Sequence, residues 1–469
     1  MQFDLVAVGG GFAGLTAACR AAQLGLRTAV LEKESAERYH CNSRYTSGVC
    51  NVMGHYMRGA PEELESLIMN GSSGTASPEL AKALATNARR AFEWLRAEGA
   101  RMIELERSEG RAVVLAPPRR FVEGLDWEGR GGDVLLRTLE ANLVTRGGQL
   151  LRGTCAESLV MKNGNCVGVE ATQDGKRVRF EARAVVLADG GFAANADMVA
   201  SHICKRPERL LVRAAKNGRG DSIRMAESAG AATGGYGAFY GHLHHVEALS
   251  NSKLWPYPHF DAIATVSLLV GPDGKRFTDE GLGGVCMSNA LAQLEDPMSA
   301  WVIYDEAMWS GEPGRKGPVA VNPYLTSAGG WMHSAPDIDA LATKTGLPAP
   351  ALATTVGAYN EAVEHNRVAD LKPARTTAKF QPLPLRKTPF HAVPLCAGIT
   401  GTMGGIVIDA NAQALRPDGT PIAGLYVSGT PLAGLEGGPL AGYVGGLSKG
   451  FILGLIAGER AAAQQGKTT

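Results

Sequence analysis

The sequence lacks a long hydrophobic run, and no apolar stretch reaches the roughly 18 residues that a membrane-spanning helix needs. Its first residues lack the basic region and small-residue cleavage site of a secretory signal peptide. The eight cysteines include no CxxC pair, which argues against a disulfide framework or a zinc motif. We therefore expect a cytoplasmic protein with free thiols, no membrane anchor and no resident metal.

An excess of charge of one sign is also lacking, because 47 Lys and Arg residues face 46 Asp and Glu residues. The net charge of +1 does not favour nucleic acid or an anionic membrane as a partner. Glycine, in contrast, is abundant, with 60 residues in a chain of 469. A chain of this length suggests two or three domains, and its glycine clusters mark the segments that carry the functional argument.

The expected strands and helices indicate an α/β fold (α+β overall) in which one domain interrupts another. Strand 3–8, a glycine turn, helix 15–24 and strand 27–31 form a βαβ unit. Strands are expected between 149 and 187, and further helices at 77–98, 133–146, 221–229 and 447–463. Residues 236–389 are rich in aromatic residues and proline and suggest irregular loops. We predict one domain from residues 1–235 and 390–469, with residues 236–389 inserted.

The first glycine turn fits the GxGxxG pattern, with Gly9, Gly11 and Gly14 at the three glycine positions. Such glycines allow a tight turn, a close approach to a diphosphate, and close packing of helix on strand. Glu32 follows Gly14 by 18 residues, at the end of the second strand, where it would accept hydrogen bonds from ribose hydroxyls. The alternative is a plain strand–helix turn with a surface glutamate.

Further short motifs follow the glycine turn along the chain. They are Asn42–Gly48 (NSRYTSG), 185–192 (VVLADGGF), 220–222 (GDS), 274–280 (GKRFTDE), 402–405 (TMGG), 424–429 (GLYVSG) and 442–446 (GYVGG). Together these segments resemble the fumarate reductase and succinate dehydrogenase flavoprotein superfamily, and the resemblance extends from Phe3 to Ala463. Within that superfamily they look closer to the tricarballylate-dehydrogenase-like and ketosteroid Δ1-dehydrogenase-like FAD dehydrogenases.

This resemblance implies a Rossmann-like FAD-binding domain and a capping domain, 236–389, that closes over the flavin ring. It implies noncovalent FAD, because Asn42 replaces the usual attachment histidine and His40 lies two residues too early. Asp189 and Thr430 also depart from the family's usual Thr and Glu. The expected cofactor-binding residues are Gly9, Gly11, Phe12, Ala13, Gly14, Glu32, Lys33, Asn42, Ser43, Thr46, Ser47, Gly48, Ala188, Gly190, Asp221, Gly429, Thr430, Gly445, Gly446 and Leu447.

Three departures from the fumarate reductases concern the reacting groups. Gly284 stands where those enzymes have a proton-donating arginine, and the Thr400–Gly401 stretch replaces a carboxylate-binding histidine. Tyr443 replaces a second carboxylate-binding arginine. Fumarate reduction is therefore not expected.

Dehydrogenation beside a carbonyl needs an electrophile, a base and a hydride acceptor. We assign the electrophile to Tyr443, whose alternative role is packing on the last helix, and proton transfer or substrate binding to His242. His244 and His245 are expected on the surface or behind the site, and HxHH alone does not predict a metal site. Arg44 is expected near the reactive edge of the flavin. The expected substrate-binding residues are Tyr45, Arg119, Arg120, Thr400 and Thr402, although the arginine pair also fits a solvated surface.

The resulting hypothesis is an FAD-dependent dehydrogenase acting on CH–CH groups, which introduces a C=C bond next to a carbonyl or carboxylate of a small organic substrate. The electron acceptor is unidentified. One alternative is a flavin-dependent reductase of an activated alkene, fumarate- or urocanate-reductase-like, supplied with electrons by a partner. The other is a flavin-binding scaffold that has lost catalysis.

Overall fold

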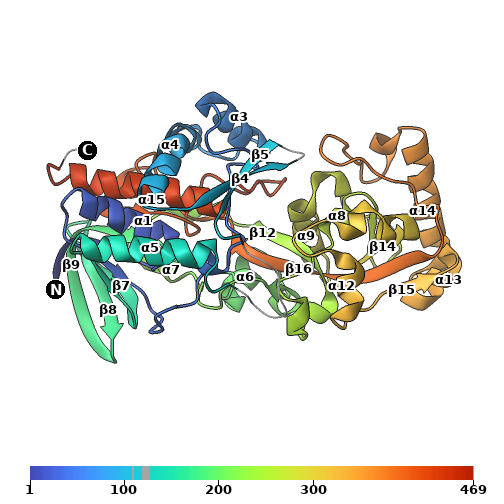
Figure 1. Cartoon of the computed structure of the whole chain (residues 1–469), viewed down its shortest axis with the longest axis horizontal. Coiled ribbons are helices and arrows are strands. Elements are labelled where there is room, and N and C mark those ends of the chain that lie inside the picture. Colours follow the sequence, from blue (N-terminus) through green and yellow to red (C-terminus); the bar gives the residue numbers. More distant parts are fainter. Residues whose placement is uncertain (108–109, 119–126, 468–469) are drawn as a thin grey trace.

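The computed structural model describes residues 1–107, 110–118 and 127–467 and has two lobes (Figure 1). The lobe at the left of Figure 1 holds both termini and helices α1 (Phe12–Gln23), α4 (Pro78–Ala97), α5 (Gly131–Thr145) and α15 (Gly446–Ala463). The long strand β16 (Phe390–Thr402) extends from this lobe into the other.

The first lobe is built on a sheet whose main path has the strand order β18-β19-β9-β1-β2-β6. Strands β19, β9, β1, β2 and β6 are parallel, whereas β18 is antiparallel to β19. Strand β8 pairs antiparallel with β9, and β7 pairs antiparallel with β8. The bounds are β1 (Gln2–Val8), β2 (Thr28–Leu31), β6 (Gln149–Leu151), β7 (Thr154–Lys162), β8 (Asn165–Gln173), β9 (Lys176–Leu187), β18 (Gln413–Leu415) and β19 (Pro421–Val427). The predicted Rossmann-like α/β fold is confirmed.

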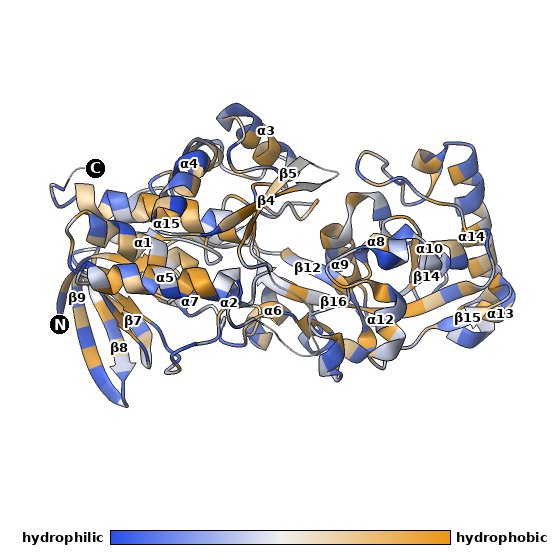
Figure 2. Ribbon diagram, viewed as in Figure 1, coloured by the Kyte–Doolittle hydropathy of each residue, from blue (hydrophilic) through white to orange (hydrophobic). Residues whose placement is uncertain are grey.

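Buried apolar residues explain this sheet, because strands covered on both faces must be apolar along their whole length. The last four residues of β1 and of β9 are all buried, and helices α1 and α15 pack side by side on the sheet. A Cβ on Gly454 or Gly458 of α15 would lie 2.7 and 2.6 Å from the carbonyl oxygens of Ala13 and Ala17 on α1. Figure 2 shows hydrophilic residues alternating with hydrophobic ones toward the tips of β8 and β9, where the sheet is less covered.

The remaining elements of the first lobe surround this core. They are α2 (Asn42–Tyr45), α3 (Pro61–Gly71), α6 (Ala196–His202), α7 (Asp221–Ser228), the sheet β3 (Val49–Cys50), β5 (Gly110–Leu115) and β4 (Met102–Arg107), and the pair β11 (Thr233–Gly234) and β17 (Gly405–Ile406). The helices expected at 77–98, 133–146, 221–229 and 447–463 are observed as α4, α5, α7 and α15. Within the described ranges, no helix combines the length and hydrophobicity that a membrane crossing needs.

The second lobe has a sheet of its own, in which β16 pairs with β10, β12, β14 and β15 and β14 pairs with β13. These partners are β10 (Leu211–Val212), β12 (Phe239–His245), β13 (Leu268–Val270), β14 (Trp301–Asp305) and β15 (His333–Ala335). The helices are α8 (Asp261–Ala264), α9 (Gly284–Ala292), α10 (Glu306–Ser310), α11 (Glu312–Arg315), α12 (Val321–Ser327), α13 (Ile338–Thr345) and α14 (Ala349–Glu364). Residues 236–389, where irregular loops were expected, thus also hold short strands and helices, with irregular stretches such as 371–389 between them.

The predicted domain boundary at 389/390 falls directly before β16. The first half of β16 pairs with β14 and β15, and its second half pairs with β12 and β10. Strand β16 thus belongs to both the cap and the wall of the site. The domain boundary at residues 389/390 therefore stays a prediction.

Candidate functional site

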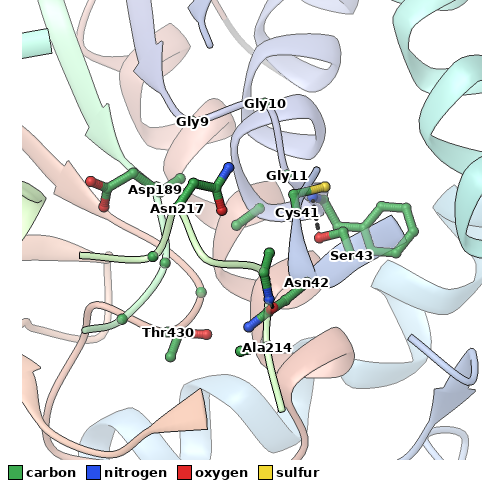
Figure 3. A pocket seen from close by; sticks show the side chains of 18 of the residues that line it. Gly9, Gly10, Gly11, Cys41, Asn42, Ser43, Asp189, Ala214, Asn217 and Thr430 are labelled. Atoms are coloured by element: carbon green, nitrogen blue, oxygen red, sulfur yellow. Dashed lines mark hydrogen bonds between the residues drawn. The ribbon is translucent and has the colours of Figure 1, made fainter. Parts of the chain in front are cut away.

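A cavity lies where the parallel strands β1, β2, β9 and β19 end at the same edge of the sheet (Figure 3). This edge is where open α/β sheets bind nucleotides. The predicted cofactor-binding residues that line it are Gly9, Gly11, Phe12, Ala13, Glu32, Lys33, Asn42, Ser43, Ala188, Gly190, Asp221, Gly429, Thr430, Gly446 and Leu447. Gly10, Asp189 and Asn217, which were not on the predicted list, also line it.

The cavity fits a dinucleotide in shape and in hydrogen-bonding groups. Helix α1 starts after Gly11, and its first residues line the cavity. Because Gly11 has no side chain to cap the helix, the N–H groups of the first turn are available to the phosphates of a nucleotide. Glu32 is 4% exposed at the end of β2, and its Oε2 accepts a hydrogen bond from the Gly10 N–H at 3.0 Å. Its Oε1 accepts from the Glu34 N–H at 3.0 Å, and burial raises its pKa. The carboxylate is thereby held where a ribose would lie.

Asn42 and Ser43 fix the wall of this cavity opposite the glycine turn. The Ser43 Oγ accepts from the Phe12 N–H at 3.0 Å. The Asn42 Oδ1 accepts from the Ala215 N–H at 2.7 Å, and its Nδ2 donates to the Thr400 carbonyl at 3.1 Å. Asn42 therefore ties the loop at Ala215 to strand β16 with an amide that is not nucleophilic.

The flavin is expected to be released by acid precipitation. The position of the usual attachment residue is held by the Asn42 amide, and the His40 ring contacts the Tyr45 hydroxyl instead of lining the cavity. The supernatant should hold the yellow chromophore, and chromatography should identify it as FAD. Flavin that stays in the protein pellet would contradict noncovalent binding.

Asp189 is a polar group in the cavity wall with one unsatisfied atom. Its Oδ2 accepts from the Ser222 N–H at 3.0 Å, whereas its Oδ1 has no hydrogen-bond partner among the described residues. Burial raises the pKa of this carboxyl to about 6. An unpartnered oxygen at this place fits a polar group of the bound nucleotide.

The FAD-free Asp189→Asn variant is expected to lose less stability than the wild type as the pH rises from about 4 to about 7. A carboxyl with a raised folded-state pKa stabilises the fold at low pH, and this contribution is lost between its unfolded value of 3.8 and about 6. The amide cannot ionise, so Tm values measured across this range isolate the effect. Parallel Tm curves for the two proteins would contradict the assignment.

A second cavity of about 890 Å³ adjoins the first and shares part of its wall, including Asn42, Ser43, Thr400, Thr402 and Thr430. The predicted residues Tyr45, Thr46, Ser47, His242, Tyr443 and Gly445 also line it. Gly14 and Gly48 line neither cavity in the described part of the chain. Gly14 instead packs against the Gly9 carbonyl, and Gly48 against Leu115. The two cavities place a nucleotide site beside a chamber lined by aromatic residues.

Tyr443 lies in this chamber with its ring stacked on Tyr240, at a centroid distance of 3.9 Å and an angle of 16°. Its hydroxyl oxygen accepts from the Gly446 N–H at 2.7 Å. Burial raises its pKa well above the usual value, so the phenol keeps its hydrogen at neutral pH. The hydroxyl is thus oriented by the backbone and retains one hydrogen to donate.

Arg213 is a residue of the chamber that sequence reasoning missed. Its Nε donates to the Pro256 carbonyl and its NH1 to the Thr400 Oγ1, both at 3.0 Å. The guanidinium lies 5.0 Å from the Tyr257 ring centroid. The sequence offered no signal, because the arginine stands alone after a two-residue strand, and only the fold brings it to Thr400. A guanidinium fixed in this way can bind a carboxylate.

The structure contradicts the expectation that Arg44 lies at the reactive edge of the flavin. The side chain is 1% exposed, forms an ion pair with buried Asp133 and donates to the Tyr39 carbonyl at 2.9 Å. It therefore ties α2 to α5 instead of facing either cavity. Arg119 and Arg120 lie outside the described residues, so their expected role is not addressed. His244 and His245 are buried, so the surface position considered for them was wrong.

His242 forms the centre of a polar chain beside the chamber. Its Nδ1 lies 2.6 Å from the Asp261 Oδ2, and its Nε2 lies 3.0 Å from the Tyr240 hydroxyl. The ring also stacks on His259 at 4.5 Å. His242, His259 and Asp261 bring ligand-type atoms within 4.8 Å of one another, a grouping that the HxHH pattern did not reveal. The 2.6 Å separation is that of a direct charge-assisted hydrogen bond between His242 and Asp261.

The fold and the dinucleotide cavity define an FAD-binding protein. The chain belongs to the FAD binding domain family, whose match covers residues 4–441.

Two relatives and one solved structure illustrate the range of this family. An NADH:fumarate oxidoreductase of Klebsiella pneumoniae (strain 342) is 29% identical over 450 residues, 93% of this chain, but the chain spans only 45% of that protein's length. A 4-oxocyclohexanecarboxylate 2-dehydrogenase of Sinomonas cyclohexanicum is 26% identical over 535 residues, covering 91% of this chain and 87% of the relative. The 3-ketosteroid Δ1-dehydrogenase of Sterolibacterium denitrificans, solved with 1,4-androstadiene-3,17-dione, shares the fold at a TM-score of 0.78, with 20% identity and coverage of 99% and 100%.

Proposed function

We propose that this protein is an FAD-dependent dehydrogenase that introduces a C=C bond next to a carbonyl or carboxylate of a small organic substrate. The observation that carries the proposal is the packing at position 284. A Cβ on Gly284 would overlap the Asp261 carboxylate, so an arginine proton donor has no room there. Two stacked tyrosines and a histidine line the chamber instead. Phenol and imidazole groups suit carbonyl polarisation and proton abstraction at neutral pH.

Each residue of the chamber has a separate role in the proposed reaction. Bound FAD supplies the hydride acceptor. Tyr443 donates its hydrogen to the substrate carbonyl, which stabilises the negative charge that forms on the oxygen when the neighbouring C–H bond ionises. Arg213, fixed by the Pro256 carbonyl and Thr400, binds a carboxylate at the other end of the substrate. The ring of Tyr257 beside Arg213 favours a flat or cyclic carbon skeleton between these two groups.

Reduction of an activated alkene is the second candidate, because the names of several relatives describe that direction. They include the fumarate oxidoreductase named above and a urocanate reductase of Eggerthella lenta that is 24% identical over 488 residues. The same polarising tyrosine serves either direction by microscopic reversibility. In this case a partner must supply the electrons.

A two-direction screen of purified holoenzyme tests the proposal. Oxidised enzyme with a dye acceptor is mixed with cyclic ketones, saturated acids and 4-oxocyclohexanecarboxylate, and enzyme with a reduced dye is mixed with fumarate, urocanate and acrylate. We expect dye reduction with a carboxylate-bearing ketone and much slower reaction of its methyl ester, since the ester cannot pair with Arg213. Turnover only in the reducing direction would favour the alkene reductase, and no turnover in either would favour a scaffold without catalysis.

Tyr443→Phe is expected to slow the chemical step by about 100-fold or more, the loss typical of one donor to a developing oxyanion. The substitution keeps the ring that stacks on Tyr240 and removes only the hydroxyl. FAD content and the flavin spectrum should be nearly unchanged. Rapid-reaction kinetics with the substrate from the screen measures the effect, and full activity in a folded, FAD-loaded variant would remove Tyr443 from the mechanism.

A further inference from the structure

Strand β12 places a tyrosine and a histidine on one side of the chamber. Tyr240 and His242 are two residues apart, so their side chains project from the same face of the strand, and both line the chamber. Behind His242, Asp261 is held from two directions: its Oδ1 accepts from the Leu243 N–H at 3.0 Å, and its Oδ2 bonds the His242 Nδ1 at 2.6 Å. The three groups form a continuous chain from a buried carboxylate to a phenol at the cavity wall.

The hydrogen bonds fix how protons are distributed in this chain. Ionised Asp261 can only accept, so the His242 Nδ1 carries a hydrogen; in the neutral imidazole the Nε2, 3.0 Å from the Tyr240 hydroxyl, then accepts from it. Both ring nitrogens of His242 are thereby engaged within the protein. The Tyr240 oxygen has lone pairs beyond the hydrogen that it donates, so it is the atom of this chain suited to accept a proton from a substrate.

We propose that Tyr240 exchanges the proton with the substrate and that His242, held by Asp261, is a positioning residue that acts through Tyr240. This inference rests on the proposed dehydrogenation beside a carbonyl. It also assigns a function to the space at Gly284, where the Asp261 carboxylate occupies the volume of a side chain.

The step balances without any change of oxidation state. The substrate C–H bond next to the carbonyl breaks, and its proton bonds to the Tyr240 oxygen. The phenolic hydrogen of Tyr240 moves to the His242 Nε2, which becomes an imidazolium paired with Asp261. The electron pair of the broken bond becomes the enolate, whose oxygen receives the hydrogen bond of Tyr443. The reverse sequence returns the proton to the substrate.

The surroundings keep the negative charge of this chain on Asp261. Burial opposes ionisation of Asp261, but the neighbouring His242 and His259 outweigh it and hold its pKa below the usual range. Burial lowers the pKa of His259 to about 3 and that of His244 well below its usual value, so both are neutral. In the described part of the chain, charged or titratable neighbours also include Arg213, whose field acts on His244 and His259, and Tyr443, which stacks on Tyr240.

The first test needs no substrate. Holoenzyme labelled with ¹⁵N-histidine is titrated by NMR in the wild type, Tyr240→Phe and Asp261→Asn. We expect His242 as the Nδ1–H form in the wild type, a changed Nε2 resonance in Tyr240→Phe, since this nitrogen loses a donor, and a changed Nδ1 resonance in Asp261→Asn, since this nitrogen loses its carboxylate acceptor. Tyr236→Phe, which removes a buried hydroxyl outside both cavities, is the matched control and should change nothing. A His242 protonated on Nε2, or one that does not respond to Tyr240→Phe, would overturn the relay.

The second test follows exchange of the hydrogens next to the ketone of 4-oxocyclohexanecarboxylate with D₂O on dithionite-reduced enzyme, where no oxidation occurs. We expect exchange to fall by about 100-fold or more in Tyr240→Phe, to fall in His242→Gln, and to persist in Tyr236→Phe. Exchange that persists in Tyr240→Phe would overturn the relay, as would exchange that chelation abolishes and Zn²⁺ restores. If the wild type exchanges nothing, this acid is not a substrate and the proposed function is in question, whereas the NMR titration still decides the relay.

Discussion

Gly14→Val is expected to yield a colourless protein that does not retain FAD. A Cβ at position 14 would overlap the Gly9 carbonyl oxygen and lie 3.3 Å from its carbonyl carbon. Both atoms belong to the glycine turn between β1 and α1, so neither can move without reshaping the diphosphate cradle. The two further methyl groups of valine would push α1 away from the sheet, and overpacking of this kind also costs about 1–3 kcal/mol of stability. Absorbance at the flavin band and a binding titration of FAD to apoprotein measure the result.

Gly357→Val provides the matched control. Gly357 lies inside α14 of the cap, and a Cβ there would meet no atom within 4 Å. The control should remain yellow and bind FAD as the wild type does. A folded Gly14→Val variant with wild-type FAD affinity would show that the diphosphate does not lie at this turn.

Fumarate with a reduced dye is expected to give little or no turnover. Position 284 cannot hold a proton donor, the Thr400–Gly401 stretch replaces a histidine, and Tyr443 replaces an arginine. Electrostatic groups of this kind are worth roughly 2.7–4 kcal/mol each. Among the described residues the cations that line the chamber are Arg213, Lys316 and Lys449; Lys449 is ion-paired with buried Glu436, and exposed Lys316 lies 3.6 Å from Glu312. Arg213 is the cation held against Thr400, and it fits one carboxylate, whereas fumarate carries two.

The control uses the same enzyme preparation, whose flavin should be reduced by dithionite and reoxidised by air. If it is, the flavin can exchange electrons, and a lack of turnover with fumarate reflects the substrate and not a damaged cofactor. Dye oxidation by fumarate on the order of 10 per second, an ordinary enzymatic rate, would overturn the dehydrogenase proposal in favour of the alkene reductase.

Local patterns predicted the nucleotide half of the molecule well. The GxGxxG turn, the strand before it, the helix after it and Glu32 all depend on neighbours within about thirty residues, and the structure has β1, α1 and β2 close to the expected ranges. The cap was misjudged because its strands are three to seven residues long and are scattered among aromatic and proline-rich turns. Their pairing with β16 joins segments far apart in the sequence, which no local pattern reports.

The individual side chains of the chamber were harder to predict than the elements that carry them. Within the single turn of α2, Asn42, Ser43 and Tyr45 reach the cavities, whereas Arg44 turns to Asp133, 89 residues away. Asp261 was not expected to matter because its partner, His242, lies on another element. The direction of a side chain follows from partners that only the folded chain brings together.

The pairing of β12 with β16 contains an irregularity whose consequence concerns the engineering of substrate range. Tyr240 pairs with Gly401 and Gly241 with Ile399, so Thr400 has no opposite residue and forms a bulge. Its side chain bonds Arg213 while the ladder continues undisturbed on both sides. A substitution at Thr400 therefore changes the hold on Arg213 and the shape of the chamber without shifting the register of either strand. A saturation library at this single codon is the natural starting point for altering which compounds bind in the chamber.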